Sequence, residues 1–228
     1  MSRRRAARLD AGGRQCNIKS MTFHRSRYIK SVCVYCGSGP GSHPAFVKAA
    51  SDFGKALAEA GIRLVYGGGS IGLMGAVAAS TLDHGGTVTG IIPDFLVRRE
   101  HAMTRAQEMV VTKDMHERKR LMFERSDAFV ALPGGIGTLE ELVEQLTWAQ
   151  LGRHAKPILI ANVEDFWQPF LALLTHMGDN AFIRPDLKVN LLTAERIGDI
   201  LPALEHAAAR AAEVAASKEM PARIADRL

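Results

Sequence analysis

Residues 133–141 have the pattern of a phosphate-binding loop followed by a helix that carries acids. The stretch reads Pro-Gly-Gly-Ile-Gly-Thr-Leu-Glu-Glu and directly follows the apolar run Asp127–Leu132. Glycines let a backbone approach an anion closely, and the first free amides of a helix point toward it. We expect Thr138 to cap this helix and to donate its hydroxyl to phosphate. Because Glu141 then projects from the first turn, the pattern predicts chemistry on a phosphorylated ligand beside a carboxylate.

Two further glycine-rich loops follow predicted strands. Gly67, Gly69 and Gly72 satisfy G-x-G-x-x-G between a strand and a helix, which is the context of a dinucleotide-binding fingerprint. Asp94 lies near the spacing of a ribose ligand, but it falls in a predicted loop. No Lys-Ser/Thr pair follows the glycines, which excludes a P-loop. The other loop, Cys36–Ser42, is equally compatible with a nucleotide contact and with a flexible turn.

The charged segment Asp114–Arg120 opens a predicted helix just after a strand. Helices that start at the carboxyl ends of strands face the ligand crevice, so we expect one of these bases in the site. Arginine suits a planar, bidentate partner such as a phosphate, a ribose or a base edge. The histidines show neither the H-E-x-x-H pattern nor paired metal-ligand spacing, so no metal is expected and His116 is interpreted as a bystander.

Apolar runs of strand length alternate with helical patterns along the chain. The predicted strands are Ser31–Tyr35, Arg63–Tyr66, Thr87–Ile92, Met109–Thr112, Asp127–Leu132, Pro157–Ala161 and Lys188–Leu192. The predicted helices are Pro44–Ala60, Leu73–His84, Met115–Ser126, Thr138–Leu151, Phe166–Met177 and Thr193–Ala208. This order predicts an α/β fold, a single doubly wound Rossmann-like domain. Its mostly parallel sheet would have about six to seven strands, with helices on both faces.

The charge of the chain is concentrated at its N-terminus. Residues 1–30 hold nine of the 29 Lys and Arg and one of the 24 acids, so the rest has a net charge of −3. A slightly acidic body argues against a nucleic-acid partner. We expect residues 1–28 to be a disordered basic arm. A transit peptide and a translation start at Met21 are the alternatives. Residues 209–228 are Ala-rich and are expected to form a C-terminal extension of the last helix.

The three cysteines, Cys16, Cys33 and Cys36, do not suit a disulfide framework. Their low, odd number is typical of a reducing compartment, and we expect a cytoplasmic protein without a membrane partner. No apolar stretch is long enough to cross a bilayer, and the N-terminus lacks the apolar region of a secretory signal. Cys33 and Cys36 lie three apart in a predicted strand and point to opposite faces, so we interpret them as small buried residues.

Three motifs resemble those of the LONELY GUY family of cytokinin riboside 5′-monophosphate phosphoribohydrolases, long misnamed lysine decarboxylases. Residues 133–141 match the family pattern P-G-G-x-G-T-x-x-E. Met115–Lys119 resembles its arginine motif, and Gly67–Gly75 resembles its G-G-G-x-x-G-L-M-G loop. The resemblance runs from Ile29 to His206, and residues outside this range are not part of it.

The resemblance implies a Rossmann-like nucleotide-hydrolase domain at residues 29–208 that requires no cofactor. It implies a homodimer whose pocket borrows residues from the partner. The implied reaction hydrolyses the N-glycosidic bond of an N6-substituted adenosine monophosphate, or of AMP, releasing the free base and ribose 5-phosphate. Arg118 and Glu141 match the catalytic pair. The positions implied to contact substrate are Gly69, Glu100, Met115, Arg118, Lys119, Gly134, Gly135, Ile136, Gly137, Thr138, Leu139, Glu140 and Thr147.

The two catalytic candidates suit this reaction chemically. A carboxylate near the ribose stabilises the electron-poor ribosyl cation and orients water, so Glu141 should be ionised. We expect the nearby helix start to keep it ionised. Arg118 can offset the charge that the departing adenine gains. Arginine is a poor proton donor, so the donor of the proton stays open.

Three other functions are compatible with parts of the sequence. The same loops suit a mononucleotide-binding module without catalysis, although binding alone requires neither Arg118 nor Glu141. The glycine fingerprint suits an NAD-dependent enzyme. An amino-acid decarboxylase would need pyridoxal phosphate on a lysine, and no lysine lies in a cofactor-loop context.

Overall fold

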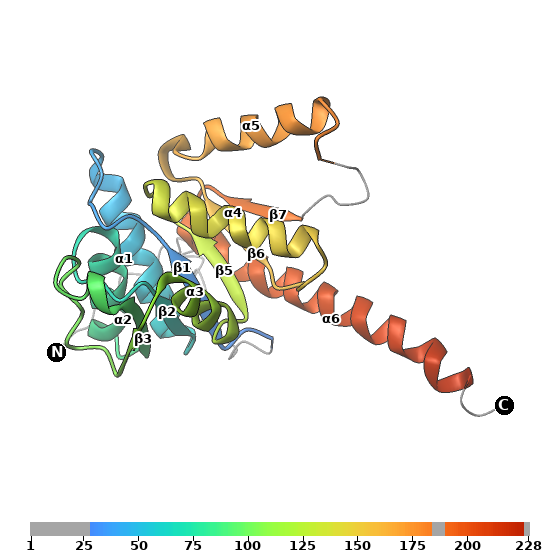
Figure 1. The fold of residues 1–228 in the computed structure, drawn as a ribbon, viewed down its shortest axis with the longest axis horizontal. Coiled ribbons are helices and arrows are strands. Elements are labelled where there is room, and N and C mark those ends of the chain that lie inside the picture. Colours follow the sequence, from blue (N-terminus) through green and yellow to red (C-terminus); the bar gives the residue numbers. More distant parts are fainter. Residues whose placement is uncertain (1–27, 184–189, 226–228) are drawn as a thin grey trace, which may run out of the picture.

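The predicted strands form one parallel sheet in the computed structural model, which describes residues 28–183 and 190–225 (Figure 1). The strands are β1 (Ser31–Tyr35), β2 (Arg63–Tyr66), β3 (Val88–Pro93), β4 (Glu108–Thr112), β5 (Ala128–Ala131), β6 (Ile158–Ala161) and β7 (Leu191–Ala194). They are ordered β4-β3-β2-β1-β5-β6-β7, and neighbouring strands are parallel. Strands buried on both faces need continuous apolar runs, and β3, β5 and β6 are buried at every position.

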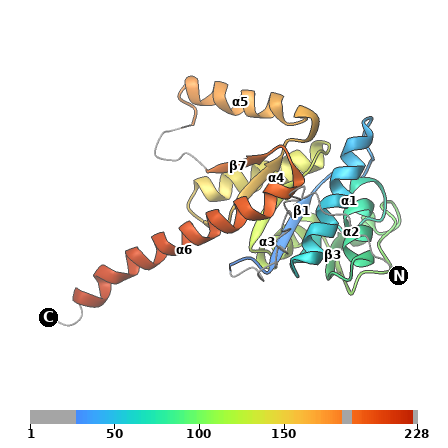
Figure 2. The same ribbon diagram turned by 180° about the vertical axis from the view of Figure 1, so that it is seen from behind.

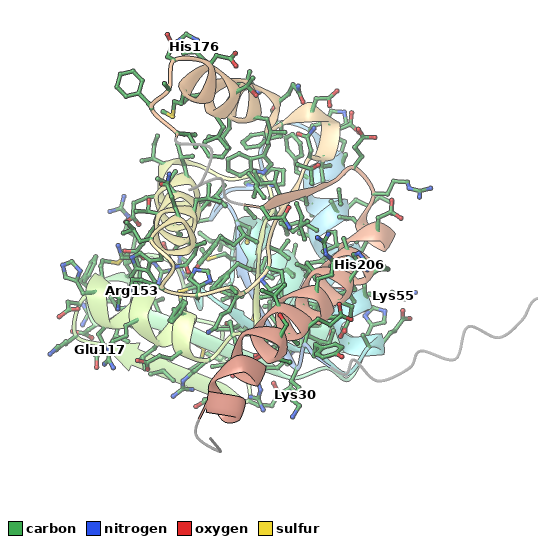
Figure 3. All side chains as sticks on the ribbon, turned by 90° about the vertical axis from the view of Figure 1, so that its right-hand side faces the viewer. Lys30, Lys55, Glu117, Arg153, His176 and His206 are labelled. Carbon is green, nitrogen blue, oxygen red and sulfur yellow. The ribbon has the colours of Figure 1, made fainter. Side chains whose placement is uncertain are left out.

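Helices cover both faces of the sheet. They are α1 (Pro44–Glu59), α2 (Gly72–Asp83), α3 (Met115–Glu124), α4 (Ile136–Gln150), α5 (Gln168–Asp179) and α6 (Ile200–Ala225). Short 3-10 turns, η1 (Asp94–Leu96), η2 (Val163–Asp165) and η4 (Ile197–Asp199), precede or connect them. Helices α1, α2 and α6 pack on one face, seen from in front in Figure 2, and α3, α4 and α5 pack on the other. Figure 3 shows the same separation, with His206 of α6 and Glu117 of α3 on opposite sides. The prediction of a doubly wound fold is confirmed.

Each face of the sheet has its own hydrophobic core. On one face, Phe53 and Leu57 of α1 are fully buried. On the other, Phe129 of β5 is fully buried among residues of α3 and α4. Cys36 belongs to the first core and Cys33 to the second, which confirms that the two thiols point to opposite faces. Cys16 and the predicted basic arm lie outside the described residues, except for Tyr28 at its end.

The strand order reverses beside β1, and this reversal positions the site. From β1 the chain proceeds outward through β2 and β3 to β4, and it then returns to β5 on the other side of β1. The loops that follow β1 and β5 therefore leave the sheet in opposite directions, which opens a crevice at the carboxyl ends of the strands. The amide of Gly37, after β1, donates a 3.0 Å hydrogen bond to the carbonyl of Pro133, after β5, and joins the two loops.

The starts of the fourth and the last predicted helix differ from the structure for identifiable physical reasons. Helix α4 begins at Ile136, two residues before Thr138, because the extended backbone of Gly135 already serves as its N-cap. The last helix begins at Ile200 and not at Thr193, because Thr193 pairs with Ile160 in β7. Strand β7 also lies later than its predicted range, of which residues 188–189 are outside the described part. Apart from the end of the last helix, the remaining boundaries agree within two residues, and those of β1 and β2 are identical to the prediction.

Helix α6 continues past residue 208 as far as Ala225, and its C-terminal half runs outward from the body (Figures 1 and 2). The predicted boundary at residue 208 therefore falls within a helix, and its status as a separate extension stays a prediction. Among the described residues, the helices are too short or too polar to span a membrane.

Candidate functional site

A cavity of about 230 Å³ lies at the carboxyl ends of β1, β2 and β5. Its lining residues are Val34, Cys36, Gly37, Ser38, Gly67, Met74, Glu100, Arg118, Gly135, Ile136, Gly137, Thr138 and Glu141. Three separate glycine-rich loops and both catalytic candidates thus meet in one place. This is where a doubly wound sheet binds its ligand.

The start of α4 forms one wall of the cavity. Gly135, Ile136 and Gly137 line it, and the first amides of a helix have no partner within the helix. Gly134 lies directly beneath Thr138, so a Cβ at Gly134 would collide with the Thr138 hydroxyl and methyl groups. Thr138 is buried at the third helical position, and it makes no capping hydrogen bond, contrary to the prediction. The wall presents free amides and one hydroxyl, a suitable seat for a phosphate.

The loop after β1 forms the opposite wall and is held by the start of α2. The amides of Leu73 and Met74 donate to the Gly37 carbonyl at 3.0 and 3.3 Å. Gly72 has a φ of +59°, and a Cβ there would collide with the Ser38 carbonyl. Only glycine tolerates both this positive φ and the close approach of the Ser38 carbonyl. The sequence left this loop undecided between a contact and a turn, and the structure places Gly37 and Ser38 in the cavity lining.

Arg118 is fixed in place by backbone carbonyls. Asp114 caps α3 by accepting a 2.8 Å hydrogen bond from the Glu117 amide, which sets the first turn of this helix. Arg118, one residue further on, is only 6% exposed. Its Nε donates to the Ile91 carbonyl at 3.2 Å and its Nη2 to the Gly67 carbonyl at 3.4 Å. A Cβ at Gly67 would overlap Nη2, so this glycine makes room for the guanidinium.

Glu141 and Arg118 form a buried ion pair. Oε1 of Glu141 lies 3.4 Å from Nη1 of Arg118, and the Glu141 residue is 8% exposed. Burial raises the pKa of Glu141 to about 7, and the nearby Arg118 counteracts this rise only in part. Contrary to our expectation, the helix start therefore does not keep Glu141 fully ionised at neutral pH. The helix dipole acts mainly within the first turn of α4, and Glu141 lies beyond that turn. The loss of water around the carboxylate therefore has the larger effect on its pKa.

The segment between η1 and β4 closes the site from a third side. Glu100 lines the cavity as predicted. Its carbonyl accepts a 3.2 Å hydrogen bond from the Ser70 amide, and Gly69 forms a β-bridge with Ala102. Gly69 therefore holds this segment through its backbone and is not part of the cavity lining.

Six other predicted substrate contacts are not among the residues that line the described cavity: Met115, Lys119, Gly134, Leu139, Glu140 and Thr147. The Met115 sulfur lies 3.9 Å from Nη1 of Arg118, and Leu139 packs against the second core. The Thr147 hydroxyl donates to the Val143 carbonyl at 2.8 Å on an exposed part of α4. Direct contact of these six residues with substrate stays a prediction.

Sequence reasoning missed the apolar part of the lining. Val34 of β1, Cys36 directly after this strand and Met74 of α2 line the cavity. Burial raises the pKa of the Cys36 thiol far above its usual range, so the thiol is uncharged. The alternation in β1 and the Met74 position in the glycine motif were the available signals. These side chains offer an apolar surface to an aromatic base.

Among the described residues, no three His, Cys, Asp or Glu side chains are grouped as metal ligands. The cavity lining holds an arginine, two glutamates, a threonine and a serine as its polar side chains. These groups suit a reaction that depends on charge, hydrogen bonding and water.

The chain is similar in sequence to known enzymes. It matches the family described as "Possible lysine decarboxylase" over residues 74–204. It is 46% identical over 181 residues to "Cytokinin riboside 5'-monophosphate phosphoribohydrolase LOG" of Oryza sativa subsp. japonica, covering 79% of this chain and 74% of that one. A phosphoribohydrolase of the same description from Rhodococcoides fascians is 43% identical over 176 residues, covering 77% and 89%.

The fold is similar to that of solved structures. The molybdenum cofactor binding protein of Rippkaea orientalis superimposes with a TM-score of 0.60 at 20% identity, covering 77% of this chain and 95% of that one. At this level of identity the likeness concerns the fold alone.

Proposed function

Because the chain belongs to the LONELY GUY family of phosphoribohydrolases, we propose that it hydrolyses the N-glycosidic bond of an adenosine 5′-monophosphate, with or without an N6 substituent. The products would be the free base, a cytokinin or adenine, and ribose 5-phosphate. The observation that carries this proposal is the buried Arg118–Glu141 pair in a cavity whose wall presents helix-start amides and the Thr138 hydroxyl.

The phosphate would bind at the start of α4, away from the bond that breaks. The free amides of Gly135–Gly137 and the Thr138 hydroxyl supply the donors. Anchoring a remote, non-reacting group allows its binding energy to orient the ribose. The anchored ribose would then present its anomeric carbon to Glu141, the sixth residue of the same helix.

Glu141 would stabilise the ribosyl cation and take a proton from the attacking water. The bond between the anomeric carbon and the base nitrogen breaks, and the water oxygen bonds to that carbon. The water proton balances the one that the departing base gains. A carboxyl with a pKa of about 7 suits this exchange, since it can both accept and release a proton at neutral pH. Arg118 would stabilise the negative charge that develops on the base.

Isotope incorporation tests whether water attacks the anomeric carbon. The enzyme would be assayed with AMP in water enriched in oxygen-18, and ribose 5-phosphate analysed by mass spectrometry at early times, before the free sugar exchanges oxygen. We expect one labelled oxygen in the sugar and none in the phosphate. Unlabelled sugar, or label in released inorganic phosphate, would contradict hydrolysis at the glycosidic bond.

Two other functions are less well supported. A mononucleotide-binding module would bind AMP tightly without turnover, and it gives no reason to bury a carboxylate against an arginine. A decarboxylase that uses pyridoxal phosphate needs a lysine, and the described residues that line the cavity include none.

We also propose that the protein works as a cytoplasmic homodimer. Helix α5 supports the dimer, because it has no buried residue although Leu173 and Met177 are apolar, at 46% and 38% exposure. It lies above α4 at one end of the molecule (Figures 1 and 3), where a second copy can cover it. The odd, low number of cysteines supports a cytoplasmic location.

A further inference from the structure

Three charged side chains join the two helices that carry the catalytic candidates. Nζ of Lys119, on α3, lies 2.7 Å from Oε1 of Glu140 and 3.0 Å from Oε1 of Glu144, both on α4. Lys119 directly follows Arg118, and Glu140 directly precedes Glu141. Helices α3 and α4 lie in the same layer on one face of the sheet (Figures 1 and 3). The ion pairs therefore act one residue away from the reacting groups.

The ammonium of Lys119 is compensated by the two carboxylates of α4. The Lys119 side chain is only 13% exposed, and a charge removed from water requires compensation. Burial would lower the pKa of Lys119, but hydrogen bonds from its ammonium to Glu140 and Glu144 outweigh burial and raise it. Glu140 and Glu144 are themselves four residues apart on one helix, where like charges repel. Lys119 lies between the two carboxylates and offsets this repulsion.

We propose that Lys119, Glu140 and Glu144 form an ion-pair clamp that holds α3 against α4 and positions Arg118 opposite Glu141. The inference rests on the proposed function, since it assigns a part in that reaction to Glu144. Glu144 is a positioning residue that acts through Lys119, and it lies outside the cavity lining of the described structure.

The clamp gives Lys119 a role that differs from direct substrate binding. The family resemblance implies that Lys119 contacts substrate, but its ammonium is turned to the two carboxylates of α4. A direct contact would change KM when the charge is removed. A positioning role would change kcat, because small displacements of reacting groups affect the chemical step more than binding.

The pKa of Glu141 reports how closely the neighbouring charged groups are held to it. From α3, Arg118 and Lys119 lower the pKa of Glu141, whereas Glu140 of α4 and Glu100 of the segment before β4 raise it. Cys33 and Tyr35 of β1 and Cys36 directly after it also interact with Glu141, and they are uncharged because burial raises their pKa values. A clamp that loosens would move the two bases away and raise the pKa of Glu141.

The isosteric substitution Glu144→Gln distinguishes a positioning role from a direct electrostatic effect by the direction in which the pKa of Glu141 shifts. Removing a negative charge would by itself lower the pKa of Glu141. Loosening the clamp would raise it, because Lys119 and Arg118 are then held less closely. Carbon-13 NMR titration of the Glu141 carboxyl in the free enzyme measures this shift without any assay of activity. A failure of the proposed function would therefore leave the clamp testable.

The experiment compares Glu144→Gln, Lys119→Met and Lys119→Arg with the control Glu124→Gln, which removes an exposed ion pair with Arg120 on α3. We expect Glu144→Gln to raise the Glu141 pKa and Lys119→Met to raise it further. In AMP hydrolysis we expect kcat to fall by about 10-fold with little change in KM. Lys119→Arg should retain much of the activity, and the control should resemble the wild type. Adding Glu144→Gln to Lys119→Met should lower kcat no further, since both act through one contact.

Several results would overturn the clamp. One is a Glu141 titration in Glu144→Gln that stays unchanged or shifts downward. Another is a rise in KM with unchanged kcat in Lys119→Met, which would make Lys119 a substrate ligand. Additive effects in the double variant would also contradict a shared contact. If the NMR shifts occur while the wild type hydrolyses neither AMP nor isopentenyladenosine monophosphate, the clamp stands and the proposed function is wrong.

Discussion

The proposed chemistry depends on the burial of a single carboxyl group. Glu141 lies among apolar and polar atoms with little access to water, and the arginine beside it restores only part of the lost hydration. An exposed glutamate would be fully ionised at neutral pH and would exchange protons poorly. The protein therefore gives up stability at this position for a carboxyl that titrates near neutrality.

The stability cost of Glu141 should depend on pH. Its pKa is raised from 4.5 to about 7 on folding, so the folded state binds this proton more tightly than the unfolded state. The resulting stabilisation is complete below about pH 4.5 and is lost as pH rises to about 7. We predict that Glu141→Gln, which resembles the protonated form, exceeds the wild type in unfolding free energy by on the order of 3 kcal/mol at about pH 8.

Urea denaturation at about pH 5 and about pH 8 measures this difference. Glu124→Gln serves as the control, because it neutralises an exposed carboxylate and should change stability little at either pH. If the unfolding free energy of Glu141→Gln differs from that of the wild type by the same amount at both pH values, the raised pKa is contradicted.

At the scale of elements, loop backbones set the geometry of the site. Arg118 reaches Glu141 because the loop after β2 has a glycine where the guanidinium lies. The amides of the helix start line the cavity because α4 begins within a run of glycines. Both arrangements shape the cavity beside the point where strand order reverses, and both depend on close approach of backbone atoms.

We predict that Gly67→Ala lowers kcat for AMP by about 100-fold or more, because the added methyl group displaces the Arg118 guanidinium from Glu141. Gly198→Ala is the matched control, since a Cβ at Gly198 meets no atom within 4 Å. Steady-state kinetics and circular dichroism of both variants provide the measurement. Normal kcat in a folded Gly67→Ala protein would show that the position of Arg118 is not critical.

The elements themselves could largely be predicted from sequence. Buried parallel strands require continuous apolar runs, so β1 and β2 were located at their observed bounds. The start of α4 was not located correctly, because a run of glycines does not indicate which residue begins the helix. Thr193 was assigned to a helix, because only its pairing with β6 identifies it as strand.

The candidate site could be predicted only where a motif marks it. Arg118 and Glu141 stand out by sequence and meet in space as expected. The Lys119–Glu144 ion pair joins residues of two helices separated by a strand, and no local pattern indicates it. The raised pKa of Glu141 depends on burial, which results from the packing of the whole domain.

At the scale of the whole molecule, the exposed apolar side of α5 predicts self-association. We expect the wild type to be a dimer and the double variant Leu173→Glu with Met177→Glu to be a monomer with little loss of Tm, because neither side chain is buried in the described chain. Light scattering coupled to size-exclusion chromatography measures the mass. The exposed substitution Glu124→Gln is the control, and a double variant that stays dimeric would place the interface elsewhere.

The function of the whole molecule is most directly tested by its products. Purified wild type, Glu141→Ala and Arg118→Ala would each be incubated with AMP and with isopentenyladenosine monophosphate, and the free base and ribose 5-phosphate quantified by chromatography. We predict equal amounts of both products from the wild type and a loss of at least about 100-fold in each folded variant. Undiminished product release by either variant, or tight binding of AMP by a wild type that never cleaves either nucleotide, would contradict the account.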